Sequence, residues 1–181
     1  NTVSNLSSTR ALRDVTEKAG GEYFASAVGE VNVVTQMKAC NAIIGGEGNG
    51  GVIYPDMHYG RDALTGIALF LTHLAKSNKT VSQLKAAYPA YVISKNKIEL
   101  TPDIDVDNVL AAVKHKYAVQ RINTIDGVKI DFEKEWIHLR KSNTEPIIRI
   151  YAESSDATQA DALAKQIIAD IQEIVSAKAL V

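Results

Sequence analysis

A dense set of hydrogen-bond donors lies in the polar segment at residues 140–149. A guanidinium, an ammonium, two hydroxyls and an amide come from Arg140, Lys141, Ser142, Asn143 and Thr144. Charge-assisted donors and converging backbone N–H groups together suit a phosphate dianion. The segment therefore predicts a phosphate site, and Arg149 returns beside it if the flanking strands pair. A polar hairpin tip, whose side chains bond their own backbone, is the alternative.

The glycine-rich segment at residues 45–51 is the second candidate site. Its five glycines let a backbone pass close to a ligand, and Glu47 and Asn49 are its functional side chains. A carboxylate beside an amide suits pairs of sugar hydroxyls, because the first accepts hydrogen bonds and the second also donates them. A nucleotide-binding loop is excluded, since Gly-Lys-Ser/Thr is missing and the residues from Val52 onward favour a strand. A flexible hairpin loop is the alternative.

Three further features do not predict a site. The acidic run at residues 103–107 resembles the start of a calcium loop, but Asn108 and Lys114 stand where that loop needs glycine and glutamate, so helix capping explains it better. Cys40 adjoins an apolar segment and is expected in the core. The histidines lie far apart and show no metal-ligand spacing: His58, His73, His115 and His138.

Composition narrows the class of protein. The chain has 181 residues, a formal net charge of −1 and 46% hydrophobic residues, which is typical of a folded globular protein. This charge argues against a nucleic-acid or membrane partner. The single cysteine allows no internal disulfide, which fits a reducing compartment and a cytoplasmic location. No signal peptide is visible, and because the chain opens with Asn1 rather than Met, we expect the natural protein to begin earlier.

The elements that position the glycine-rich segment form a mixed α/β pattern. The expected elements are a helix over 12–19 capped by Ser7 or Ser8, a strand over 23–28, a short helix that includes Val31, Val34 and Met37, strands over 41–44 and 52–55, and a helix over 61–78. The opening helix has no strand before it. The sequence therefore predicts an α/β domain that is only partly present.

The elements that position the polar segment form a different pattern. The expected elements are a strand over 97–100, a helix through Leu110, Val113 and Tyr117 capped by Asp105 or Asp107, strands over 118–125, 128–132, 136–140 and 147–153, and a final helix after Asp156 that buries Leu163, Ile167, Ile171 and Ile174. This predicts an α+β domain with an antiparallel sheet and helices on one face. The expected division is 1–78, a connector over 79–90, and 91–181.

The two loops together resemble those of the α-D-phosphohexomutase superfamily. The sugar-selecting loop of that family matches Gly46–Gly51, and its phosphate loop matches Arg140–Pro146. The flanking segments 5–12, 28–30 and 59–62 follow in the family's order, so the resemblance spans nearly the whole chain. It implies the end of domain 3 followed by domain 4 of a four-domain enzyme.

The resemblance implies an enzyme that interconverts hexose 1-phosphates and 6-phosphates through a bisphosphate. In the family, a phosphoserine loop and an aspartate-rich Mg²⁺ loop carry the chemistry, and neither Ser-His-Asn-Pro nor Asp-Gly-Asp-x-Asp-Arg occurs here. The chain is therefore expected to hold no catalytic or metal residues and to be inactive alone. Its expected partners are a hexose phosphate and the missing amino-terminal domains, with Mg²⁺ and hexose 1,6-bisphosphate as cofactors of the whole enzyme.

The resemblance also assigns roles to single residues. Gly46, Glu47, Gly48 and Asn49 would bind the sugar, and Arg140, Ser142, Asn143 and Thr144 would bind phosphate with Arg149 in support. The form of the sugar loop favours glucosamine phosphate, although Gly51 stands where some members have histidine. The alternatives are a phosphoglucomutase/phosphomannomutase of the same family and a non-catalytic sugar-phosphate-binding module. The fourth domain is expected to move as a lid about residues 79–90.

Overall fold

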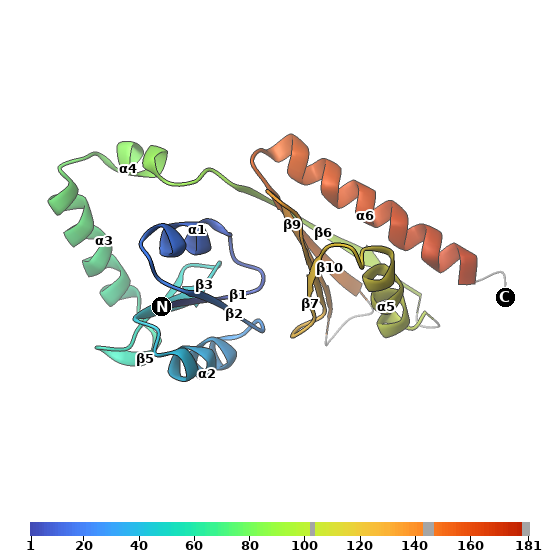
Figure 1. The fold of residues 1–181 in the computed structure, drawn as a ribbon, viewed down its shortest axis with the longest axis horizontal. Helices are drawn as coiled ribbons and strands as arrows, with labels where there is room; N and C mark the ends of the chain where they lie inside the picture. The colour runs from blue at the N-terminus through green and yellow to red at the C-terminus, as the bar shows by residue number, and fades with distance from the viewer. Residues whose placement is uncertain (102–103, 143–146, 179–181) are drawn as a thin grey trace. The chain divides into compact units, whose positions relative to one another are not determined.

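The computed structural model describes residues 1–101, 104–142 and 147–178. The chain divides into two compact units, a first unit over Asn1–Ala90 and a second unit over Tyr91–Val181 (Figure 1). Each unit has one five-stranded sheet. The mixed sheet of the first unit and the antiparallel sheet of the second confirm the predicted fold class. No helix of the described residues is long and apolar enough to cross a membrane.

The sheet of the first unit has the strand order β2-β1-β3-β4-β5. Its strands are β1 (Thr2–Asn5), β2 (Tyr23–Ser26), β3 (Ile44–Glu47), β4 (Gly51–Tyr54) and β5 (His58–Arg61). Strands β2, β1 and β3 run parallel, and β3, β4 and β5 follow as antiparallel hairpins. Its helices are α1 (Ala11–Lys18), α2 (Glu30–Cys40), α3 (Ala63–Ser77) and α4 (Val81–Ala87). The core lies between the sheet and α2, around Val3, Val33, Met37, Ala42 and Ile53.

The expectation that no strand precedes the opening helix is wrong, because β1 is a central strand of the sheet. All four residues of β1 are buried. Its polar side chains are paired inside the unit: Thr2 Oγ1 lies 2.7 Å from Thr16 Oγ1, and Ser4 Oγ lies 2.9 Å from Tyr23 Oη. A strand that is buried on both faces does not alternate between polar and apolar residues, so its sequence lacks the pattern that would predict a strand.

The predicted cap of α1 is also wrong. The residue at the N-cap position is Arg10, which makes no side-chain cap. Ser7 and Ser8 instead bond to the end of β1, since the Ser7 N–H and the Ser8 hydroxyl donate to Asn5 Oδ1 at 3.0 and 2.9 Å. These bonds fix the loop that leaves the carboxyl end of β1.

Two other features of the first unit were not predicted. The buried residues of α2 are Val33 and Met37, whereas Val31 is 77% exposed. The glycine-rich segment is mostly strand, because β3 runs to Glu47 and β4 starts at Gly51, and β5 was not predicted. β5 escaped prediction because its four residues are polar or small and largely exposed.

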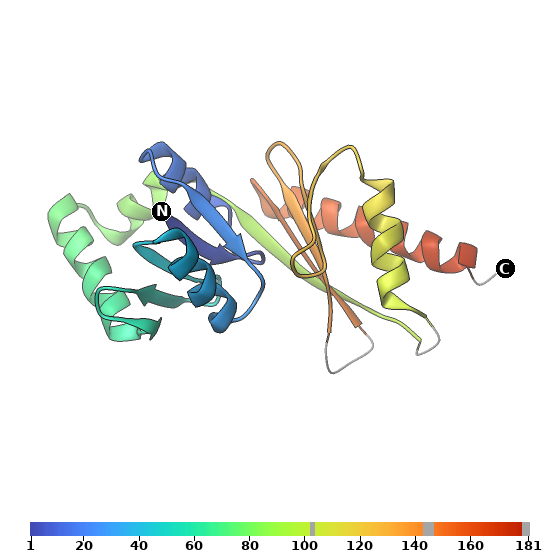
Figure 2. The same ribbon diagram turned by 60° about the horizontal axis from the view of Figure 1, so that its bottom comes forward.

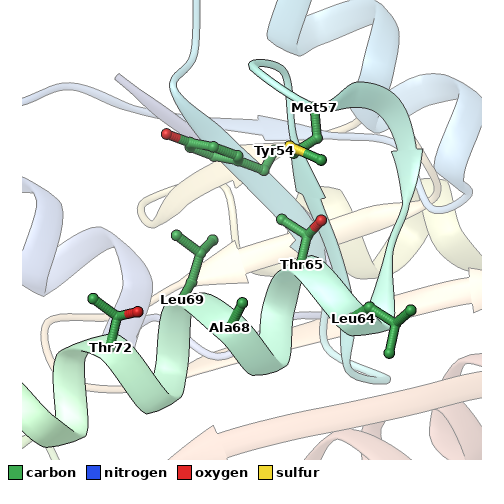
Figure 3. A pocket seen from close by; sticks show the side chains of 7 residues that line it. All are labelled: Tyr54, Met57, Leu64, Thr65, Ala68, Leu69 and Thr72. Carbon is green, nitrogen blue, oxygen red and sulfur yellow. The ribbon is translucent and has the colours of Figure 1, made fainter.

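Helix α3 exposes a large apolar surface. None of its residues is buried, and Leu64, Ile67 and Leu71 are 79%, 54% and 54% exposed. A hollow of about 400 Å³ separates α3 from the β4 end, and Figure 3 shows α3 side chains pointing across it toward Tyr54. Its lining consists of Tyr54, Met57, Leu64, Thr65, Ala68, Leu69 and Thr72. The helix that the spacing of the apolar residues predicted is confirmed, and the structure adds that these residues are not buried.

The sheet of the second unit is antiparallel throughout, with the order β6-β10-β9-β8-β7. Its elements are β6 (Val92–Glu99), α5 (Val106–Lys116), β7 (Arg121–Asn123), β8 (Val128–Asp131), β9 (Trp136–Lys141), β10 (Ile147–Ser154) and α6 (Ala157–Lys178). Helices α5 and α6 cover one face of the sheet (Figures 1 and 2), and Ile137, Leu139, Ile148, Ile150 and Ile167 are fully buried in the shared core. The opposite face carries no helix of this unit.

Several local signals of the second unit are confirmed. Asp105 is the N-cap of α5 and accepts hydrogen bonds from the N–H groups of Asp107 and Asn108, which is why the acidic run is not a calcium loop. Gly127 takes a positive φ of 74° in the turn between β7 and β8. Strand β6 is longer than expected. It lies at the edge of the sheet, where a strand tolerates polar residues on the face that points away from the core.

Candidate functional site

The first part of the site lies where the parallel strands of the first unit end. Asn5 is the last residue of β1, Glu47 is the last of β3, and Gly29 follows β2. The chain leaves β1 for β2 on one side and returns through α2 to β3 on the other, so the strand order reverses at β1. Open α/β sheets bind ligands outside the carboxyl ends of their strands at such a reversal. The predicted sugar-binding residues therefore lie at a favourable place in the fold.

Glu47 is held in place by one of its two carboxylate oxygens. Its Oε1 accepts a hydrogen bond from Asn5 Nδ2 at 2.9 Å and another from the Gly29 N–H at 3.0 Å. Within the described residues its Oε2 makes no hydrogen bond. The carboxylate is thus fixed in direction and keeps one acceptor oxygen open, which suits a ligand hydroxyl.

The glycines of this hairpin allow close backbone packing. In the β3–β4 pairing Gly46 lies opposite Val52, and a Cβ on Gly46 would stand 2.1 Å from the Gly51 carbonyl oxygen. A Cβ on Gly48 would stand 3.2 Å from the Ser8 Cα. Asn49 is exposed at the tip of the hairpin, and its Oδ1 accepts a hydrogen bond from the Gly51 N–H at 3.2 Å.

A charged cluster, defined here as Glu30, His58, Arg61 and Asp62, adjoins this hairpin. Arg61 Nε lies 2.7 Å from Glu30 Oε2, and the Arg61 backbone N–H donates to Glu30 Oε1 at 3.1 Å. This backbone hydrogen bond lowers the pKa of Glu30. Asp62 caps α3 through the Thr65 N–H, which lowers the pKa of Asp62, and its Oδ2 lies 3.2 Å from His58 Nε2.

A hollow of about 240 Å³ near the hairpin is not the pocket of the Glu47 carboxylate. Its lining includes Ser4, Leu12, Ile44, Gly46 and Val52, on the sheet face that carries α1. Glu47 pairs with Gly51 and points to the other face, toward the start of α2. Gly46, Glu47 and Gly48 border the hollow, but the polar groups that could bind a sugar lie on the face of the sheet that carries α2.

The second part of the site is a cationic row on the helix-free face of the second unit. Arg149 on β10 lies directly opposite Lys97 on β6 and Arg140 on β9. Residues in register on neighbouring strands point to the same face, so these three cations stand side by side. Lys97 Nζ lies 2.8 Å from Glu99 Oε1, and Arg140 Nη1 lies 3.6 Å from Asp126 Oδ2. The side chain of Arg149 makes no hydrogen bond or ion pair within the described residues.

The base of the predicted phosphate loop is closed by a backbone hydrogen bond. The Ser142 N–H donates to the Ile147 carbonyl at 3.0 Å, and Ser142 is buried. Asn143 and Thr144 lie outside the described residues. A hollow of about 290 Å³ opens beside this base and is lined by Lys95, Asn96, Lys97, Ile147, Arg149 and Tyr151.

Next to the cationic row lies a buried polar layer. His138 is 2% exposed, and burial lowers its pKa to about 4, so the imidazole is neutral at physiological pH. Its Nε2 donates to the Asp126 carbonyl at 2.6 Å, since a carbonyl can only accept. Lys129 Nζ stands 4.1 Å from the centre of the Trp136 ring, and the indole N–H donates to Glu153 Oε1 at 2.6 Å. This layer fixes the strands that carry Arg140 and Arg149.

Sequence reasoning placed some of these residues and missed others. Gly46, Glu47, Gly48 and Asn49 lie together on one hairpin, and Arg140, Ser142 and Arg149 lie together around one loop base. Asn5, Arg61 and Lys97 were not predicted as site residues. Asn5 and Arg61 fall in the flanking segments that carry the family resemblance, which was the available signal, whereas Lys97 joins the site only through strand register.

No metal site is visible in the parts of the chain that the structure describes. Over residues 1–101, 104–142 and 147–178 no group of three or more His, Cys, Asp or Glu side chains could hold a metal ion. The described side chains therefore do not fit a resident metal ion.

Two family models match the chain. The model described as "Phosphoglucomutase/phosphomannomutase, alpha/beta/alpha domain III" matches residues 1–91, and "Phosphoglucomutase/phosphomannomutase, C-terminal domain" matches residues 94–170. Together these two models cover the first unit and most of the second.

Curated relatives agree with the family models. The phosphoglucosamine/phosphogalactosamine mutase of Sulfurisphaera tokodaii is 33% identical over 178 residues, which are 97% of this chain and 38% of that protein. The phosphoglucomutase/phosphomannomutase of Thermococcus kodakarensis is 34% identical over 158 residues, which are 87% of this chain and 35% of that protein. The chain thus spans between a third and two fifths of the length of these relatives.

Solved structures show the same fold. A phosphoglucomutase/phosphomannomutase family protein from Burkholderia thailandensis has a TM-score of 0.78 and 23% identity, over 97% of this chain and 37% of that chain. The Aspergillus fumigatus N-acetylphosphoglucosamine mutase, solved in complex with GlcNAc-6P and magnesium, has a TM-score of 0.65 and 15% identity, over 92% of this chain and 37% of that chain. The chain belongs to the phosphoglucomutase/phosphomannomutase family of α-D-phosphohexomutases and comprises its domains III and IV.

Proposed function

We propose that this chain is the substrate-recognition part of an enzyme that interconverts hexose 1-phosphates and 6-phosphates, with glucosamine phosphate as the preferred substrate. The names of its relatives support this choice, since a phosphoglucosamine/phosphogalactosamine mutase matches 97% of the chain. The hairpin around Glu47 would bind sugar hydroxyls. The loop base around Arg140 would bind the phosphate that is not being transferred.

The cationic row carries the proposal. Like charges directly opposite each other on neighbouring strands are destabilising, yet Arg149 stands between Lys97 and Arg140. Glu99 and Asp126 offset the two outer cations, while the central Arg149 has no anionic partner among the described residues. A phosphate dianion supplies the missing charge and can accept several of these donors at once.

An anchor of this kind fits the chemistry of a mutase. Phosphoryl transfer depends mostly on positioning and electrostatic stabilisation. When a bisphosphate intermediate turns between two half-reactions, its other phosphate needs a fixed binding group that accepts either end of the sugar. Arg140 and Arg149, together with Ser142 and the predicted Asn143 and Thr144, would provide this group.

On the sugar side, Glu47 accepts a hydrogen bond from a sugar hydroxyl through its open Oε2, and Asn49 adds an amide at the hairpin tip. The described side chains do not fit a metal ion. We therefore assign the magnesium and the phosphoryl donor to parts of the enzyme outside this chain, and no role above passes through them. A structure of the Aspergillus fumigatus enzyme is named as a complex with glucose 1,6-bisphosphate, and a bisphosphate of the same class, the 1,6-bisphosphate of the substrate hexose, is the intermediate that we propose here.

The test of the anchor is Arg140→Ala in the enzyme that contains this chain. We expect kcat/KM to fall about ten- to a hundredfold, because a charge-assisted hydrogen bond is worth about 1.5–3 kcal/mol. Arg121→Ala, an exposed arginine on β7, is the matched control and should leave the kinetics unchanged. Unaltered kinetics in Arg140→Ala would contradict the anchor.

A phosphoglucomutase/phosphomannomutase is the second candidate, because a relative of that name is 34% identical. Turnover of glucosamine 1-phosphate and glucose 1-phosphate by the whole enzyme separates the two. We also propose that the 181-residue chain alone has no mutase activity. Measurable turnover by the purified chain would overturn that part of the proposal.

A further inference from the structure

The side chain of Arg61 occupies the space above Gly51. A Cβ on Gly51 would stand 2.8 Å from Arg61 Cδ and 3.1 Å from Arg61 Cγ, and it would stand 3.4 Å from Asn49 Oδ1. Gly51 lies opposite Glu47 in the hairpin, so this space is on the sheet face to which Glu47 points. The Arg61 stem therefore rests on the sugar-recognition hairpin, beside its two functional side chains.

Glu30 fixes the direction of the Arg61 guanidinium. Its two oxygens hold the Arg61 Nε at 2.7 Å and the Arg61 backbone N–H at 3.1 Å. These bonds use one of the five N–H donors of the guanidinium. The Nη1 and Nη2 atoms make no hydrogen bond within the described residues, and the side chain is 52% exposed. Four donors thus remain available in a fixed plane.

The hairpin otherwise offers one carboxylate and one neutral amide. Glu47 only accepts hydrogen bonds, and Asn49, whose Oδ1 already accepts from the Gly51 N–H, adds only the uncharged donors of its Nδ2. A sugar hydroxyl has acceptor lone pairs as well as a proton, so complete recognition needs donors on the protein. Arg61 is the cationic donor that the geometry brings to this face of the hairpin.

We infer that Arg61 is a specificity-determining residue of the sugar-recognition hairpin, whose Nη1 and Nη2 donate hydrogen bonds to oxygens of the bound hexose phosphate. The inference rests on the proposed function. Glu30 acts as a positioning residue through Arg61. Gly51 is required because any larger side chain would displace the Arg61 stem.

The test is steady-state kinetics of Arg61→Met in the enzyme that contains this chain. Methionine keeps an aliphatic stem over Gly51 and removes the donors. We expect KM for the hexose phosphate to rise about ten- to a hundredfold with kcat little changed, since binding common to ground and transition state is lost. Arg61→Lys should recover part of this loss. Lys18→Met removes the same charge from an exposed site at the end of α1 and should have no effect.

A second variant changes the contact between Gly51 and the Arg61 stem at the glycine. Gly51→Ala leaves Arg61 in the sequence but drives its stem away, and it should raise KM as Arg61→Met does. The melting temperature, followed in parallel, distinguishes this from unfolding of the hairpin. An unchanged KM in Arg61→Met would overturn the inference, whatever the effect of Gly51→Ala.

Glu47→Gln separates this inference from the proposed function. If Glu47→Gln weakens substrate binding and Arg61→Met does not, the role of Arg61 fails and the sugar-recognition hairpin stands. If neither variant changes KM, the proposed function of the hairpin fails as well.

Discussion

At the scale of the residue, the site is defined by pairs of residues on neighbouring strands. These pairs can be identified only when the register of the strands is known. The sequence suggested that Arg149 returns beside the polar loop if the strands pair, and β9 and β10 do pair with Arg149 opposite Arg140. Lys97 could not be foreseen, because its place depends on the register of an edge strand. Arg61 was not predicted as a site residue for a similar reason, since the sequence of β5 has no apolar pattern that indicates a strand. The roles of all these residues stay predictions.

The central position of Arg149 gives a prediction for stability. Arg149→Met removes a like charge from between two others, so the chain without ligand should become more stable by about 0.2–1 kcal/mol. If the proposed anchor is correct, glucose 1,6-bisphosphate should stabilise the enzyme that contains this chain, and the same variant should lose that stabilisation. Urea unfolding with and without the bisphosphate measures both effects. A destabilised Arg149→Met would show that Arg149 has a structural role instead.

His138 gives a prediction for pH dependence. Burial lowers its pKa from 6.5 to about 4, so the unfolded chain binds the proton more tightly than the folded chain. The stability that neutral His138 contributes is therefore complete above pH 6.5 and is lost as the pH falls toward 4, by about 3 kcal/mol at most. Urea unfolding at pH 7 and pH 4.5, followed by the fluorescence of Trp136, measures this loss.

The control for His138 lies in the same unit. His138→Gln should flatten the pH dependence of unfolding, whereas His115→Gln, an exposed position on α5, should leave it as it is. An equally steep pH dependence in His138→Gln would mean that another group is responsible.

At the scale of the element, the sequence predicted best where one face of an element is buried. Helix α5 with its Asp105 cap and strands β8 and β9 lie close to their expected positions, because they pack one apolar face on a single core. Strand β1 was missed because both its faces are buried and its polar side chains bond residues of α1 and β2. For α3, periodicity indicated a helix but could not show that its apolar residues are exposed.

The exposed face of α3 gives a prediction for surface behaviour. Leu64→Gln with Leu71→Gln should reduce the binding of a hydrophobic dye by the 181-residue chain, because both residues are more than half exposed and share one helix face. Val119→Gln is the control, since Val119 is 91% exposed and belongs to the second unit. Equal dye fluorescence in the double variant and the control would contradict this.

At the scale of the whole molecule, the chain consists of two units that match two consecutive family domains. The fold class and the family could be recognised from the sequence, because the residues of two separate loops match the motifs of the family and occur in the same order along the chain. The hinge at residues 79–90 stays a proposal. Helix α4 lies within that range and buries Leu84, so the first unit continues to Ala90.

The two units have separate hydrophobic clusters of unequal size, a small one around Val3 and Ile53 and a larger one around Ile137 and Ile150. Heating the 181-residue chain should therefore give two calorimetric transitions rather than one. The indole emission of the sole tryptophan, Trp136, should follow only the transition of the second unit. Ile53→Val should lower the other melting temperature and leave the fluorescence transition in place, so each half of the chain can be engineered without disturbing its neighbour.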